Sequence, residues 1–362
     1  MHARRVGSYA PLARRSVLPA GALALVLGLS ACGGGPTPPG LDATAPPPSE
    51  AALVAAPGSS RSSTPPAPTA STEAGGATGS GSSGASTAAP RPGVAGRVAS
   101  AAARLRRERP TDEVLTSAAT VVAGPATAAS LREVAAAGDE AWRRCRAVWP
   151  AAEDVPPLVV VLASSPETAG EAPGTPTGAR PSSAPVEAVA TTVVAGRPPS
   201  ARVRVHLDPR GWAALTEKGR RVVLTHECVH VALAARARPA APAWLVEGTA
   251  EYVAYRDAAV RREEVLAPLF ARVAREGAPA SFPADADFEV GHGDLTQVLG
   301  AYAEASSAAA VYADLYGEPA LLRLVTTGPG APGPGSFREL EAVFLPQWRH
   351  ELQQAALRST QL

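Results

Sequence analysis

Hydrophobic positions follow regular patterns only after the first third of the chain. Residues 158–162 form a continuous apolar run, which is typical of a buried strand. Residues 201–207 alternate between apolar and polar side chains, and this period of two predicts a strand with one polar face. Residues 115–122 and 186–194 also favour extended structure. Together these segments predict a small mixed sheet.

Helical spacing dominates the second part of the patterned region. Residues 128–148 contain no proline and carry apolar residues at helical intervals. After Asp208 the pattern stays mostly helical, with segments at 218–236, from Pro242 onward and at 337–352. Strands first and helices afterwards predict an α+β domain, in which the small mixed sheet precedes a mainly helical half.

Composition separates the two parts of the chain further. The 362 residues include 37 Pro and 33 Gly, and no aromatic residue lies between Tyr9 and Trp142. A segment without large apolar side chains cannot offset the entropy of ordering. We therefore expect residues 32–110 to be a disordered tether and residues 111–362 to form one domain. The basic segment 97–110 is interpreted as solvated linker, with a short helix as the alternative.

The N-terminus has the features of an export signal. A basic start precedes a short apolar stretch, residues 16–30, which ends in Leu29-Ser-Ala-Cys32. This ending resembles the bacterial lipobox. The resemblance implies that residues 1–31 are a lipoprotein signal peptide and that Cys32 is acylated. The exported protein would then be anchored to the outer face of the bacterial cytoplasmic membrane. An ordinary signal peptide with a chance cysteine is the alternative.

Charge and cysteine content narrow the possible functions. Lys and Arg number 34 against 33 Asp and Glu, for a net charge of +1, and no long basic block exists. This balance disfavours a nucleic-acid partner. Three cysteines are too few for a disulfide scaffold. A bond between Cys145 and Cys228 stays open, because exported proteins can form disulfides.

The candidate chemistry lies in His226-Glu-Cys-Val-His230, within the predicted helix 218–236. Two histidines four residues apart share one helical face, so both imidazoles can reach one ion, and neutral imidazole suits zinc. Glu227 lies one residue further round the helix, where it could accept a proton from water on the metal. Two histidines buried for packing alone would leave Glu227 without a role. Cys228 is turned about 200° from His226, which favours packing over ligation.

A catalytic zinc needs a third protein ligand and leaves its fourth position open. Seventeen residues after His230 the sequence reads Trp244-Leu-Val-Glu247-Gly-Thr-Ala-Glu251. Glu247 and Glu251 are four residues apart on the helix predicted from Pro242, so both could face the metal. Spacing alone leaves the choice between them open.

These two stretches together resemble the gluzincin metallopeptidases, most closely the small bacterial peptidase-MA-like branch. The resemblance implies a zincin-like fold over about residues 111–355, with Glu247 as the third ligand. It implies that Glu251 orients His226 by a hydrogen bond and that Tyr302, leading the later helix, stabilises the transition state. It also implies that strand 201–207 is the edge strand along which an extended peptide substrate binds.

The activity implied by the resemblance is hydrolysis of peptide or protein substrates with one Zn²⁺ per chain. Glu227 would accept the proton of a zinc-activated water, and Tyr302 would donate to the oxyanion. No segment matches the amine-binding motif of the related aminopeptidases, which favours an endopeptidase. The alternative is a catalytically silent zincin-fold lipoprotein that acts as a binding module at the cell surface.

Overall fold

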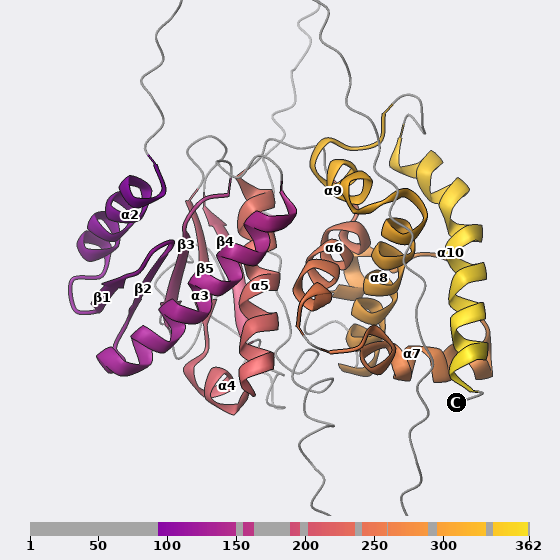
Figure 1. Cartoon of the computed structure of the whole chain (residues 1–362), viewed down its shortest axis with the longest axis horizontal. Coiled ribbons are helices and arrows are strands. Elements are labelled where there is room, and N and C mark those ends of the chain that lie inside the picture. The colour runs from indigo at the N-terminus through magenta and orange to yellow at the C-terminus, as the bar shows by residue number, and fades with distance from the viewer. Residues whose placement is uncertain are drawn as a thin grey trace, which may run out of the picture. The chain divides into compact units, whose positions relative to one another are not determined.

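The computed structural model describes residues 93–149, 155–162, 189–195, 202–235, 241–258, 260–288, 295–330 and 336–360. Its strands are β1 (Glu113–Thr116), β2 (Thr120–Gly124), β3 (Leu158–Leu162), β4 (Ala190–Ala195) and β5 (Arg202–Leu207). Its helices are α2 (Val94–Glu108), α3 (Ala128–Val148), α4 (Pro209–Ala214), α5 (Glu217–Ala234), α6 (Ala243–Arg256), α7 (Arg262–Glu276), η2 (Asp285–Phe288), α8 (Leu295–Tyr316), α9 (Glu318–Thr327) and α10 (Phe337–Ser359). The α+β class is therefore confirmed, with the strands preceding α4 and a helical half following it (Figure 1).

The five strands form one small mixed sheet in the order β1-β2-β3-β5-β4. The β2–β3 and β3–β5 pairs are parallel, whereas β1–β2 and β4–β5 are antiparallel. Strand β5 therefore lies inside the sheet, and β4 is the edge strand next to it. The expectation that residues 201–207 form the edge was wrong.

The polar face of β5 explains this difference. Its residues alternate as predicted, since Val205 and Leu207 are fully buried in the main core. On the polar face, however, Arg204 and His206 are buried and only Arg202 stays exposed, and both arginines pair with Glu108 at the end of α2. An alternating strand is usually half-exposed, but here Arg204 on the second face is buried beside an ion-pair partner from a distant helix.

Helix α2 extends the packed domain toward the N-terminus. Its apolar side consists of Val98, Ala101, Ala102 and Leu105, which are buried against residues of β2 and β3. The sequence alone predicts a domain that begins near Thr111, with residues 97–110 as linker. The packed unit instead includes α2, because alanine and valine at helical spacing suffice to cover one face of the sheet. The signal segment and Cys32 lie outside the described residues.

The segment expected to be a single strand, 115–122, is a hairpin. Strands β1 and β2 are separated by a turn at residues 117–119. Asp139 of α3 holds this turn, since its carboxylate accepts hydrogen bonds from the amides of Ala118 and Ala119. The long-range carboxylate replaces the glycine or proline that usually marks a turn, so the local sequence did not reveal it.

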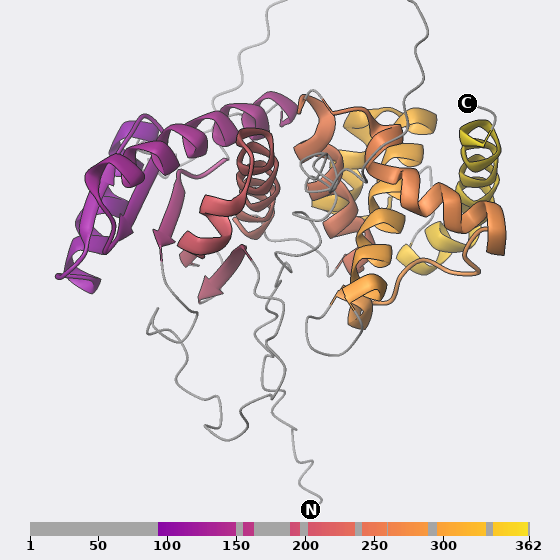
Figure 2. The same cartoon turned by 90° about the horizontal axis from the view of Figure 1, so that it is seen from below.

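The opposite face of the sheet is covered by α3 and α5, and the helical half packs against α5 through α6 (Figures 1 and 2). Helices α6 and α8 approach closely at Gly248, where an added Cβ would meet the carbonyl oxygen of Ala305 at 2.3 Å. A glycine at this position therefore permits the contact that brings Tyr302 of α8 to the site. Within the described ranges, no helix combines the length and the apolar character needed to cross a membrane.

Candidate metal centre

Helix α5 carries the two histidines through the interior of the domain. It begins at a Thr216 cap, whose side chain accepts a hydrogen bond from the amide of Gly219. The later turns are apolar on several sides and contact both α3 and α6. As a result His226 and Glu227 are fully buried and His230 is 5% exposed. Buried polar groups need partners, and the partners come from α6 and β4.

Helix α6 is held in register by its tryptophan. The indole nitrogen of Trp244 donates a hydrogen bond to Glu341 Oε1 at 2.8 Å, and its ring stacks on Phe282 at a centroid separation of 4.2 Å. Three residues later, Glu247 enters the interior with only 5% exposure. The packing of Trp244 thus fixes where this carboxylate lies.

Three donor atoms meet between the two helices. His226 Nε2 lies 2.9 Å from His230 Nε2. Glu247 Oε2 lies 3.3 Å from the first of these nitrogens and 3.2 Å from the second. Ligands at about 2.0–2.1 Å from a tetrahedral ion are separated by about 3.3 Å. The observed spacings match one face of such a tetrahedron, so these three buried residues could hold a metal ion.

Glu251 lies one helical turn beyond Glu247 and behind the His226 ring. Its Oε1 is 2.9 Å from His226 Nδ1, on the side of the imidazole opposite Nε2. A proton shared between Nδ1 and this carboxylate leaves the lone pair of Nε2 for a metal. The structure therefore brings Glu247 to the donor cluster and places Glu251 against the far nitrogen, a choice that spacing left open.

The charges in this cluster favour a protonated His226 when no metal is bound. Burial disfavours the imidazolium, but the nearby carboxylates of Glu247 and Glu251 outweigh it and raise the pKa of His226 to about 10. Burial alone would raise the pKa of Glu247, but the neighbouring histidines outweigh burial and lower this pKa well below its usual range. A cation at the Nε2 position is thus strongly favoured, whether proton or metal.

Glu227 points from α5 toward the sheet. Thr192 Oγ1 of β4 donates a hydrogen bond to Glu227 Oε2. The other oxygen, Oε1, is buried and has no hydrogen-bond donor among the described residues. Burial raises the pKa of this carboxyl, while the two histidines and Thr192 act in the opposite direction. A carboxylate with a raised pKa and a free oxygen has the properties of a general base.

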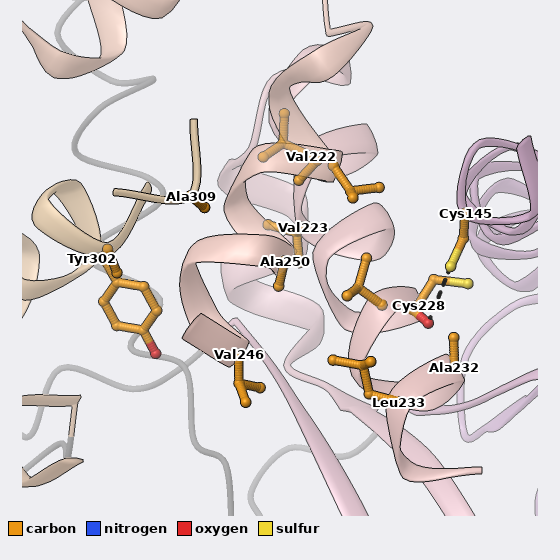
Figure 3. Close-up of a cluster of buried hydrophobic side chains, with 14 of the residues drawn as sticks. Cys145, Val222, Val223, Cys228, Ala232, Leu233, Val246, Ala250, Tyr302 and Ala309 are labelled. Atoms are coloured by element: carbon orange, nitrogen blue, oxygen red, sulfur yellow. Dashed lines mark hydrogen bonds between the residues drawn. The ribbon is translucent and has the colours of Figure 1, made fainter. Parts of the chain in front are cut away.

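Tyr302 reaches the cluster from α8. Its ring centroid lies 6.3 Å from that of His226, and the edge of Phe288 packs against it at 5.2 Å. Figure 3 shows its hydroxyl directed toward the part of α6 that carries Val246, the neighbour of Glu247. Burial, and to a smaller extent the charges of the nearby glutamates, raise the pKa of Tyr302 well above its usual value. The phenol therefore keeps its proton at neutral pH and can donate a hydrogen bond.

The cysteines lie on the other side of α5. Figure 3 shows Cys228 on the side that faces α3, near Cys145. The thiol of Cys145 donates a hydrogen bond to the carbonyl oxygen of Cys228 at 3.5 Å, and both residues are buried with no disulfide between them. Cys228 takes no part in the donor cluster, as its angular position predicted, and the disulfide that the sequence left open is not formed.

Sequence reasoning missed two residues at this centre. Thr192, the partner of Glu227, lies in a segment recognised only as extended, and no local signal relates it to a residue 35 positions later. Phe288, which packs on Tyr302, lies in the short helix η2, which no pattern indicated. Comparison of the chain with protein-family models, curated proteins and solved structures finds no match.

Proposed function

We propose that this protein is a zinc-dependent metallopeptidase of the gluzincin type, with one Zn²⁺ per chain. The observation that carries the proposal is the buried triangle of His226, His230 and Glu247, together with the buried carboxylate of Glu227 beside it. Three protein ligands and an open fourth position are typical of catalytic rather than structural zinc. Two imidazoles and one carboxylate also form a donor set that suits zinc.

The residues around the triangle divide the chemistry of peptide hydrolysis among them. Zinc, when bound, supplies Lewis acidity that brings the pKa of a coordinated water to about 7. Glu227 accepts the proton of the attacking water and later returns it to the leaving amine. Tyr302, protonated at neutral pH, donates to the oxygen of the attacked carbonyl. Glu251 keeps the His226 ring oriented.

The proposal includes the location suggested by the N-terminal sequence. Acylation at Cys32 would anchor the exported chain to the outer face of the cytoplasmic membrane. The segment between Cys32 and α2 is long and rich in Pro, Ala, Ser, Thr and Gly. Such a tether would let the domain reach peptide or protein substrates near the membrane surface.

The test compares wild type with Glu227→Gln in metal analysis and in digestion of a broad peptide library read by mass spectrometry. We expect one zinc per chain in both proteins and a loss of cleavage of about 10²–10⁴-fold in the variant, the usual contribution of a general base. Glu263→Gln, an exposed change on α7, is the control and should cleave normally. A wild-type protein without stoichiometric zinc would instead favour the silent binding module.

A further inference from the structure

The partner of Glu227 lies on the edge strand of the sheet. Thr192 pairs with Val205 of β5 in the antiparallel register, so its side chain shares the face of Val205. That face carries the main core and is covered by α5. Thr192 is itself 4% exposed, whereas its neighbour Thr191 pairs with His206 and lies on the opposite face. The strand therefore aims one of two adjacent threonines at the candidate base.

The hydrogen bond from Thr192 makes the two oxygens of Glu227 inequivalent. Oε2 accepts the threonine proton, while Oε1 has no donor among the described residues. A glutamate side chain has three rotatable bonds, and its terminal torsion is broad. The threonine hydroxyl also lies 3.5 Å from the backbone carbonyl oxygen of Glu227, but its shorter contact is with Oε2. A bond from this strand to Oε2 therefore restricts which oxygen is presented and in which direction.

We propose that Thr192 is a positioning residue that holds Glu227 so that Oε1 serves as the proton acceptor. The inference rests on the proposed peptidase function. In the step concerned, an O–H bond of the attacking water breaks and its proton bonds to Oε1. The water oxygen bonds to the carbonyl carbon, and the carbonyl π electrons move to the carbonyl oxygen. Thr192 keeps its own proton throughout, because it donates only a hydrogen bond.

Substitutions at position 192 separate the hydroxyl from the packing of the side chain. Thr192→Val keeps the shape and removes the donor, whereas Thr192→Ser keeps the donor and removes a methyl group. Thr192→Ala also removes the donor and provides a second protein in case the valine variant does not fold. Thr191→Val is the matched control, because it makes the same change on the other face of β4.

The first readout is the effect of each substitution on kcat and on KM, measured separately with a peptide that wild type cleaves. We expect Thr192→Val and Thr192→Ala to lower kcat by about 10- to 100-fold, with KM and zinc content unchanged. Thr192→Ser should recover most of the rate, and Thr191→Val should match wild type. Wild-type kcat in the valine and alanine variants would overturn the inference. Equal losses in the serine and valine variants would also overturn it, since packing would then explain the effect.

The second readout does not depend on turnover. Crystal structures of the zinc-loaded wild type and variants would show the Glu227 carboxylate in one orientation for Thr and Ser. We expect several orientations, or a rotated one, for Val and Ala. An unchanged carboxylate in Thr192→Val would overturn the inference even if the enzyme is active. If wild type cleaves no peptide, the proposed function fails, but this readout still decides whether Thr192 orients Glu227.

Discussion

The side of α5 that faces α3 and the side that faces α6 are both buried, but different chemistry fills them. Toward α3, Cys228 packs among apolar residues, and the contact with Cys145 is a weak sulfur hydrogen bond. Toward α6, the histidines meet two carboxylates at 2.9–3.3 Å. Packing of the first kind tolerates many side chains of similar volume. The second kind has few solutions, because each buried charge needs a partner at a defined distance.

This contrast distinguishes the candidate metal centre from the rest of the core. Apolar packing on the α3 side accounts for the position of α5 without any ligand. The α6 side instead concentrates buried carboxylates and imidazoles, which are costly for stability unless paired. Clusters of perturbed ionisable groups are characteristic of functional sites. Substitutions on the two sides should therefore differ in kind.

Loss of a ligand on the α6 side should have the largest effect. His230→Ala removes one of three donors, so we expect no stoichiometric zinc after gel filtration, as measured by inductively coupled plasma mass spectrometry. His350→Ala, an exposed histidine on α10, is the control and should retain one zinc per chain. A full complement of zinc in His230→Ala would show that the metal binds elsewhere.

Metal affinity should rise with pH. The pKa of His226 is raised to about 10 by Glu247 and Glu251, so this histidine is protonated at pH 7 and must release a proton to bind zinc. An imidazole at its ordinary pKa of about 6.5 would show this competition only below that pH. We expect the apparent affinity to increase about tenfold per pH unit between pH 7 and pH 9.

Competition with a chelator of known proton affinity measures this dependence. Glu251→Gln should make it shallower, because the variant lacks one of the two carboxylates that raise the pKa of His226. An affinity that stays constant above pH 7 in wild type would contradict the assignment of a protonated His226 in the metal-free protein.

Removing the partner of His226 Nδ1 should weaken the site without abolishing it. Glu251→Gln leaves all three donor atoms in place, but the ring loses the carboxylate that orients it. Such outer partners contribute about 10–100-fold in metal affinity or activity. We expect a loss of that size at pH 9, measured by chelator competition. Glu276→Gln, at the exposed end of α7, should bind zinc as wild type does, and equal affinities of the two variants would refute the role of Glu251.

The opposite side of α5 should respond only in stability. Cys228→Ala removes a buried sulfur that faces α3, and we expect it to lower the free energy of unfolding by about 1 kcal/mol. Its zinc content and cleavage rate should equal those of wild type. Denaturant unfolding and metal analysis test both expectations, and a loss of zinc would show that the two sides of α5 are not independent.

The sequence predicts an element of this fold well when the contacts that determine the element are between residues close together in the chain. The span of α3 and the positions of α5 and α6 follow from helical spacing and from prolines at their ends. The histidine pair follows from one helical turn. By contrast, the place of β5 inside the sheet depends on its strand partners and on Glu108 of α2, which also pairs with its arginines. Nothing near residue 202 in the sequence reveals these contacts.

The candidate site divides along the same line. The sequence spacing identifies Glu247 and Glu251 as equal candidates for the third ligand. Only the packing of α6 against α5 shows that Glu247 lies at His226 Nε2 and Glu251 at His226 Nδ1. Thr192 reaches Glu227 across the junction between sheet and helix, so the register of β4 with β5 decides its role. Local sequence patterns thus predict which residues belong to the candidate site, whereas tertiary contacts determine the position and orientation of their side chains.

The most direct measurement is zinc K-edge X-ray absorption of the purified wild-type protein with its metal content determined in parallel. We expect one zinc per chain, with two imidazole nitrogens and oxygen ligands at about 2.0–2.1 Å and no sulfur. A chain that binds no zinc, or a spectrum with a sulfur ligand at about 2.3 Å, would contradict the claim that His226, His230 and Glu247 form the metal centre.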